Sequence, residues 1–204
     1  MPTKEKVYRG FMLEVRSAEP SAENEHELRV EGYAAVFDQE TDLGGFHEVI
    51  RKGAFSKTLK ESDQVALWGH DMNQPLARKS AGTLELSEDD HGLAVGITMD
   101  DRIPRHVDAF HSIKRGDVKG TSFGFSVVKD TVTDGDIPLR ELHEVRLFEV
   151  SPTAFPAYEA TEIEARSVLD RISTCEPGPE THSEAGDVAR DAAKRKREIQ
   201  LMEI

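Results

Sequence analysis

The sequence KGTSFGFSVV, residues 119–128, places a small hydroxyl residue, Ser122, between Gly120 and Gly124 and then continues as an apolar run. Such a run is typical of a β-strand. The two glycines let the backbone approach a bound molecule closely and leave their N–H groups unobstructed. This setting suits a nucleophilic serine, although the same letters also fit a serine that merely begins a strand. A nucleophilic role for Ser122 requires a base and an orienting group elsewhere in the chain.

Length, charge and cysteine content limit the classes of protein to which the chain can belong. A length of 204 residues allows one domain of ordinary size with a tail, and hence one principal site. The formal net charge of -13 and a pI near 5.1 argue against nucleic acid as the main partner, because phosphate contacts need clustered Lys and Arg. The single cysteine, Cys175, excludes an intrachain disulfide and fits reducing conditions. We expect a soluble protein with no membrane partner, since the sequence shows no signal-peptide core and no membrane-spanning apolar run.

Alternating apolar and polar residues predict a mainly β fold. Residues 28–37 alternate around Gly32 as a half-buried strand does, and residues 84–86 and 93–99 flank a polar turn like the arms of a hairpin. Further strands are expected at residues 7–15, 64–69, 142–150 and around Ser122, and short helices at residues 53–60 and 107–113, the second with Gly116 as its C-cap. Because the strands do not alternate with long helices, the sequence predicts a closed or nearly closed β-barrel rather than a parallel sheet.

The composition changes after about Thr161. Residues 173–186 include Pro177, Gly178 and Pro179 among acidic and small polar residues, which predicts a linker with little fixed structure. The charged, alanine-rich residues 185–204 could form a terminal helix. We therefore expect a barrel domain at residues 1–161 and a flexible, charged C-terminal tail at residues 162–204.

A base for Ser122 must come from the eight histidines. The nucleophile elbow of an α/β-hydrolase would place a helix after the serine and the histidine late in the chain, and neither pattern is present. His70 ends an apolar strand and follows Gly69, so it can be both held and exposed, and it is our candidate base. His106 and His111 are five residues apart on a predicted helix and point to different faces, which argues against a metal site there. Two histidines that stand beside a glutamate stay open as alternatives: His47 and His143.

Six short blocks lie in order between residues 28 and 160: EGYA at 31–34, GAF at 53–55, GHD at 69–71 with PL at 75–76, DHGL at 90–93, TSFGF at 121–125, and EVS at 149–151 with FPA at 155–157. Each block is weak alone, but the ordered set resembles the HK97-type prohead protease family of tailed phages. One departure is the sequence ARK at residues 77–79, where the family pattern has a glycine soon after the leucine.

The resemblance implies a serine endopeptidase whose fold is related to the herpesvirus assembly proteases, a β-barrel surrounded by helices. By position, Ser122 matches the nucleophile of the family and His70 its base. Glu149, in the EVS block near the end of the last core strand, is taken as the third member of the triad. The alternatives for this third position are Glu144, Glu141 and His143.

The resemblance also implies a biological setting. The substrates would be the scaffold protein, or a scaffold segment of the major capsid protein, together with the protease itself, inside the assembling prohead in the host cytoplasm. A homodimer, as formed by the herpesvirus enzymes, is compatible with it, and no cofactor or metal ion is expected. Two other hypotheses stay open: a catalytically silent assembly or scaffolding protein with the same barrel, and a hydrolase of small esters, which the missing elbow disfavours.

Overall fold

The computed structural model of the protein describes residues 6–11, 16–18 and 26–155. Apolar alternation folds most of these residues into strands, and short helical segments connect them. The elements follow in the order β1 (Val7–Phe11), β2 (Arg16–Ala18), β3 (Glu27–Val36), β4 (Thr41–Asp42), β5 (His47–Ile50), α1 (Thr58–Glu61), β6 (Val65–Trp68), β7 (Asp71–Arg78), the 3-10 helix η1 (Lys79–Ala81), β8 (Leu84–Glu88), β9 (Gly92–Asp100), α2 (Pro104–Arg115), β10 (Gly120–Thr133) and β11 (Leu139–Thr153).

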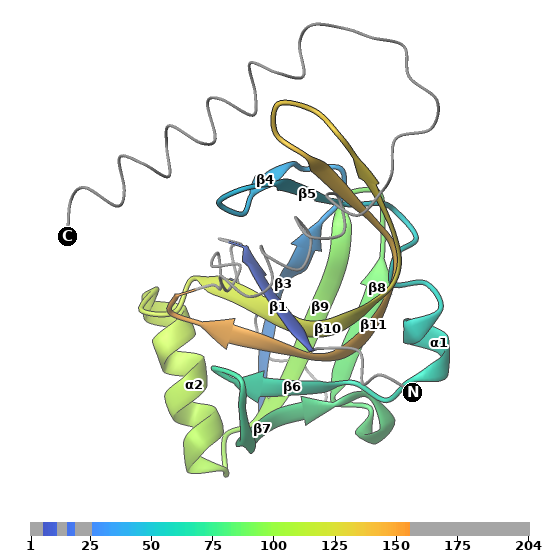
Figure 1. Ribbon diagram of the computed structural model, residues 1–204. Coiled ribbons are helices and arrows are strands. Elements are labelled where there is room, and N and C mark those ends of the chain that lie inside the picture. The colour runs from blue at the N-terminus through green and yellow to red at the C-terminus, as the bar shows by residue number, and fades with distance from the viewer. Residues whose placement is uncertain (1–5, 12–15, 19–25, 156–204) are drawn as a thin grey trace, which may run out of the picture.

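The long antiparallel hairpin of β10 and β11 forms the middle of the larger sheet. β1 pairs with the first half of β10, so that Ser122 lies between Gly10 of β1 and Ser151 of β11. Figure 1 shows β1 beside this half of the hairpin, while the far end of the hairpin arches over β4 and β5. The strand that carries Ser122 is therefore a central strand with neighbours on both sides.

The second edge of β11 is shared by two short parallel strands with a helix between them. β5 pairs with residues 139–142 of β11, and β6 pairs with Glu149 and Val150. Between these strands, the N–H of Leu147 donates to the hydroxyl of Thr58 in α1 over 3.1 Å. The helix thus satisfies the backbone where no strand is present, and β6 brings the chain to Glu149.

The second sheet has the order β2-β3-β9-β8, and α2 packs beside β3 and β9. Proline in the first turn begins α2, and Gly116 ends it with a left-handed φ of 81°. The apolar residues of both sheets form one core, in which Phe123 stacks on Phe125 at 5.1 Å and meets the edge of Phe55 at 5.6 Å. These three rings are fully buried, and burial of each contributes about 1.5–3 kcal/mol.

The prediction of a mainly β fold with few helices is confirmed, but the prediction of a closed or nearly closed barrel is wrong for the described residues. The strands of this part of the chain form a seven-stranded sheet and a four-stranded sheet, and no strand pair joins the two. Alternation in a sequence reveals which face of a strand is buried, but not which strand it pairs with. Two facing sheets bury the same apolar faces that a closed barrel would bury.

Several elements also differ in extent from the sequence-based predictions. β7 was missed because its polar residues and Pro75 argue against a strand; it pairs only with β6, and Pro75 lies opposite Leu67 at an irregular register. β11 continues through Pro152, and α1 is shorter than the helix expected at residues 53–60. The strands expected at 28–37 and around Ser122, the hairpin of β8 and β9, and the helix ending at Gly116 are confirmed. The expected tail at residues 162–204 lies outside the described residues, so the division into domains stays a prediction.

Candidate active site

One face of the larger sheet gathers the side chains around Ser122. Directly paired residues of antiparallel strands point to the same face, and so do residues two apart along a strand. Ser122 lies between Gly10 and Ser151, and in the next row Gly124 lies opposite Glu149. Two hydroxyls and a carboxylate therefore share this face, and the two glycines leave space above it.

A tight turn between β6 and β7 brings His70 to the same face. Gly69 and His70 both have a left-handed φ, of 55° and 66°. This conformation costs a histidine free energy and is typical of functional sites. The N–H of Gly69 donates to the carbonyl oxygen of Pro152, and the N–H of His70 donates to Oγ of Ser151, each over 3.2 Å. The turn is thus anchored to the end of β11.

His70 and Glu149 form a hydrogen-bonded pair. Nδ1 of His70 lies 2.8 Å from Oε1 of Glu149, whose side chain is only 3% exposed. The other oxygen, Oε2, accepts a hydrogen bond of 2.6 Å from Oγ of Ser151. This contact suits the imidazole tautomer in which Nδ1–H donates to the carboxylate and Nε2 is left as an acceptor. The ring of Tyr8 meets the imidazole edge-on at 4.6 Å, so contacts on two sides hold the ring in place.

Gly124 provides the space for this pair. The φ of Gly124 does not lie in the left-handed region, so its backbone conformation does not require a glycine. The lack of room for a side chain is what requires one. A Cβ atom at position 124 would lie 2.5 Å from Oε1 of Glu149 and 3.1 Å from a ring carbon of Tyr8. The carboxylate oxygen that binds His70 can therefore reach its position only over a glycine.

The hydroxyl of Ser122 is held by the neighbouring strand. Its Oγ donates to the carbonyl oxygen of Arg9 over 2.7 Å, and the side chain is fully buried. Ser122 and Ser151 form one row of paired residues across the sheet, and Gly124 and Glu149 form the next row, about 7 Å along the strand. His70 contacts both rows, because it binds Glu149 in one and Ser151 in the other. The hydroxyl thus points to β1 and lies beside the His70–Glu149 pair without a hydrogen bond to it among the described residues.

The alternatives for the third position lie elsewhere on the molecule and have other partners. His143 contacts Thr131 at 2.9 Å, Glu144 binds Lys57 at 3.1 Å, and Glu141 binds Arg51. His47, which the sequence left open as another candidate histidine, pairs with Glu40. Of the acids considered from the sequence, the structure brings Glu149 to His70.

No group of three or more His, Cys, Asp or Glu side chains in the described ranges is arranged to hold a metal ion. His106 is buried in α2, where its Nδ1 accepts the N–H of Asp100 over 3.1 Å, and burial lowers the pKa of its imidazole. This histidine thus links the end of β9 to α2. In the same part of the chain, no helix is long and apolar enough to cross a membrane.

Sequence reasoning missed two residues of this face, Ser151 and Tyr8. A signal for Ser151 was present, because a residue two positions after Glu149 on a strand shares its face. Tyr8 gave no such signal, since its place opposite Gly124 depends on the pairing of strands that are far apart in the sequence.

Two comparisons with known proteins find matches to this chain. A family model described as caudovirus prohead serine protease matches residues 11–174 of the chain. One similar protein is the prohead protease of Enterobacteria phage HK97, which is 34% identical over 148 residues. The match covers 71% of this chain and 62% of that protein, so the chain spans less than two thirds of the length of this relative. No solved structure matches the chain.

Proposed function

The chain belongs to the caudovirus prohead serine protease family, and from this we propose that it is a serine endopeptidase of phage capsid maturation. In this proposal Ser122 is the nucleophile, His70 the general base and Glu149 the acid that orients the histidine. The observation that carries it is the 2.8 Å bond between His70 and Glu149, made on the sheet face that also bears Ser122.

The reaction begins when the hydroxyl of Ser122 turns from the carbonyl oxygen of Arg9 to Nε2 of His70. Oγ then bonds to the carbonyl carbon of the peptide while its proton passes to Nε2, and the carbonyl oxygen becomes an oxyanion. The C–N bond breaks as the amine leaves with the proton from Nε2, and an acyl-enzyme remains. Water gives a proton to Nε2 and attacks the acyl carbon, which releases the acid and restores the hydroxyl of Ser122.

Glu149 and Ser151 act through the histidine. The carboxylate of Glu149 keeps the proton on Nδ1 and stabilises the imidazolium that forms when Nε2 accepts a second proton. Ser151 holds the other carboxylate oxygen and also accepts the N–H of His70, so one hydroxyl positions both members of the pair.

The proposed substrates are the scaffold protein, or a scaffold segment of the major capsid protein, and the chain itself, inside the assembling prohead. A homodimer and a relation of the fold to the herpesvirus proteases stay predictions. The alternative, a catalytically silent assembly protein, is favoured by one observation: the hydroxyl of Ser122 is buried and bound to Arg9.

Two measurements on the full chain separate these functions. A fluorophosphonate, which phosphonylates activated serines, should add to Ser122 and not to the Ser122→Ala or His70→Ala variants, as shown by mass analysis of peptides. Co-expression with the capsid protein of the same phage should give fragments that disappear in Ser122→Ala, because loss of the nucleophile costs on the order of a millionfold in turnover. Ser126→Ala, a change of a buried serine on the same strand, is the control and should keep both activities. A folded protein with neither adduct nor fragments would establish the silent alternative.

A further inference from the structure

Two cations lie over aromatic rings next to the proposed triad. Nζ of Lys6 is 4.9 Å from the ring centroid of Tyr8 and 5.8 Å from that of Phe148. Cζ of Arg146 is 5.6 Å from the centroid of Phe148. Both cations are exposed, and Tyr8 is 37% exposed. These four residues are termed the cation–aromatic patch.

A β-bulge gives Phe148 its place in the patch. The register passes from Gly124 opposite Glu149 to Phe125 opposite Leu147, so that Phe148 has no partner on β10. Bulges redirect side chains and are common beside active sites. The extra residue thus adds a ring to β11 directly before Glu149.

The patch is continuous with the triad through Tyr8. Lys6 lies over the ring of Tyr8, and the same ring contacts the imidazole of His70 edge-on, with the two ring centroids 4.6 Å apart. A ligand bound to the patch would therefore lie beside the proposed base.

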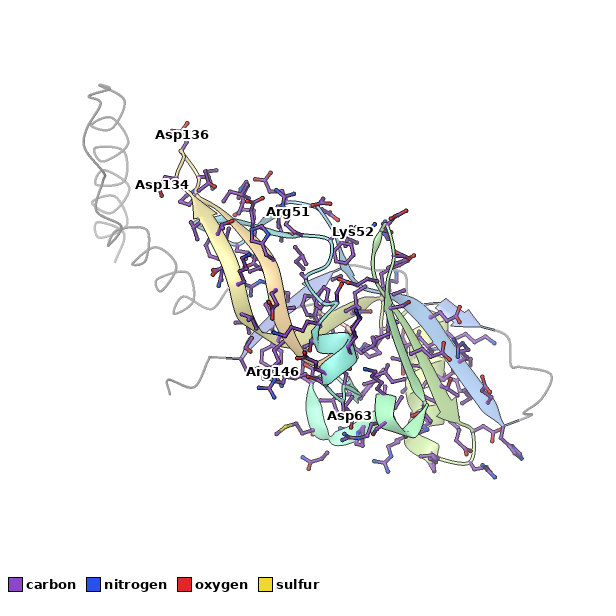
Figure 2. The ribbon with its side chains drawn as sticks, turned by 90° about the vertical axis from the view of Figure 1, so that its right-hand side faces the viewer. Arg51, Lys52, Asp63, Asp134, Asp136 and Arg146 are labelled. Carbon is purple, nitrogen blue, oxygen red and sulfur yellow. The ribbon has the colours of Figure 1, made fainter. Side chains whose placement is uncertain are left out.

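Neither cation of the patch has a carboxylate partner within the described part of the chain. Many other surface cations of this acidic protein do pair with a carboxylate: Arg29, Arg51, Lys52, Lys57, Arg78, Arg102 and Arg115. Figure 2 shows Arg146 near the base of the β10–β11 hairpin, far from Asp134 and Asp136 at its tip. The N–H groups of Lys6 and Arg146 are therefore available to a ligand.

The chemistry of the patch selects a carboxylate. The cations cover ring faces that an apolar side chain would need, and they repel a basic one. A guanidinium binds a carboxylate through two parallel hydrogen bonds, and an ammonium adds a further charged donor. We infer that the patch binds an Asp or Glu side chain of the peptide substrate and so sets part of the cleavage specificity; this inference rests on the proposed protease function.

The strand register gives the position of this acidic residue relative to the cleaved bond. Cε of Lys6 lies 2.7 Å from the place of a Cβ at Gly124, one row from Ser122, and Arg146 pairs with Ser126, two rows from Ser122. A row is about 7 Å, and an extended peptide advances about 3.3 Å per residue. The acidic residue therefore lies about two to four residues from the cleaved bond, and on one side of it only.

In the test, the full chain digests a mixed peptide library. The library is prepared beforehand by cleaving a bacterial proteome with chymotrypsin. Mass spectrometry identifies the cleaved bonds and the residues around them. The unmodified chain should show Asp and Glu enriched at one or two positions within this window. In the double variant Lys6→Glu, Arg146→Glu, the preference for Asp and Glu at these positions should fall by at least about tenfold. A preference for Lys and Arg should appear there instead. Because the preference is a ratio measured within one variant, a change in turnover common to all peptides does not affect it.

The control is Lys129→Glu, which reverses an exposed cation outside the patch, on β10 and seven residues beyond Ser122, and should leave the preference unchanged. Cleavage without an acidic preference in the unmodified chain, or an equal preference in the double variant, overturns the subsite and leaves the proposed function intact. Absence of both cleavage and a fluorophosphonate adduct in the unmodified chain overturns the proposed function and the subsite with it.

Discussion

One added methyl group at position 124 should disable the site while the protein stays folded. A Cβ at this position would lie 2.5 Å from Oε1 of Glu149, and an ordinary contact begins at 3.4 Å. Oε1 would therefore have to move by about 0.9 Å, a shift that would open its 2.8 Å bond with His70 to roughly 3.7 Å, beyond hydrogen-bond range.

The size of the effect follows from this displacement. A misplacement of about 1 Å in a catalytic constellation can cost on the order of 100-fold in turnover, and complete loss of the orienting acid about 10,000-fold. Gly124→Ala should therefore lower kcat by about 100-fold to 10,000-fold. Overpacking costs about 1–3 kcal/mol in stability, which most domains tolerate.

The assay is cleavage of a peptide identified by the library digest, with kcat and melting temperature measured for each variant. Gly135→Ala is the matched control, because a Cβ there would lie 3.4 Å from the nearest atom, the carbonyl oxygen of Ile137. It should change neither quantity appreciably.

A double-mutant cycle tests the cause. If the methyl group acts through Glu149, Gly124→Ala should cost little more in a Glu149→Gln background. An equal loss of kcat in both backgrounds would refute the reasoning, because the methyl group would then act on the substrate or the backbone.

Three further changes test separate parts of the molecule. Glu149→Gln should lower kcat about 10,000-fold, because the imidazole loses its orienting charge, whereas Glu141→Gln should change kcat little; similar kcat values for the two variants would argue against Glu149. Glu48→Gln should cost about 3–5 kcal/mol in urea unfolding, because it removes the charge of a buried carboxylate that binds the guanidinium groups of both Arg9 and Arg140, and a loss under 1 kcal/mol would contradict this. Burial lowers the pKa of His106, so below about pH 6.5 the unfolded chain takes up a proton that the folded chain does not bind, and stability falls as the pH falls. The melting temperature should therefore drop more between pH 7 and pH 5 in the unmodified chain than in His106→Asn, and equal drops would count against this role of burial.

The elements of the fold were easier to predict than their assembly. Alternation around Gly32 identified β3, and Gly116 marked the end of α2, because these signals are local. β7 was hidden by Pro75, which an edge strand tolerates and a central strand does not. The division into two sheets depends on which strands pair, and residues distant in the sequence decide this.

The candidate site shows the same limit. Ser122 and His70 could be singled out because each has a glycine within two residues and adjoins an apolar strand. The choice of Glu149 relied on the order of short blocks, since Glu141 and Glu144 lie on the same strand. The bond from Ser122 to Arg9 could not be predicted, because it depends on the pairing of β1 with β10.

The position of Ser122 between β1 and β11 also governs the order in which the site can form during synthesis. A ribosome delivers β1 first, then the turn with His70, then the strand of Ser122, and Glu149 and Ser151 only with the last strand of the sheet. Until β11 has emerged, His70 has neither the carboxylate nor the hydroxyl that holds it. In the proposed mechanism, a nascent chain that has not reached residue 149 therefore carries Ser122 without an oriented base, and at that stage it cannot cleave neighbouring proteins.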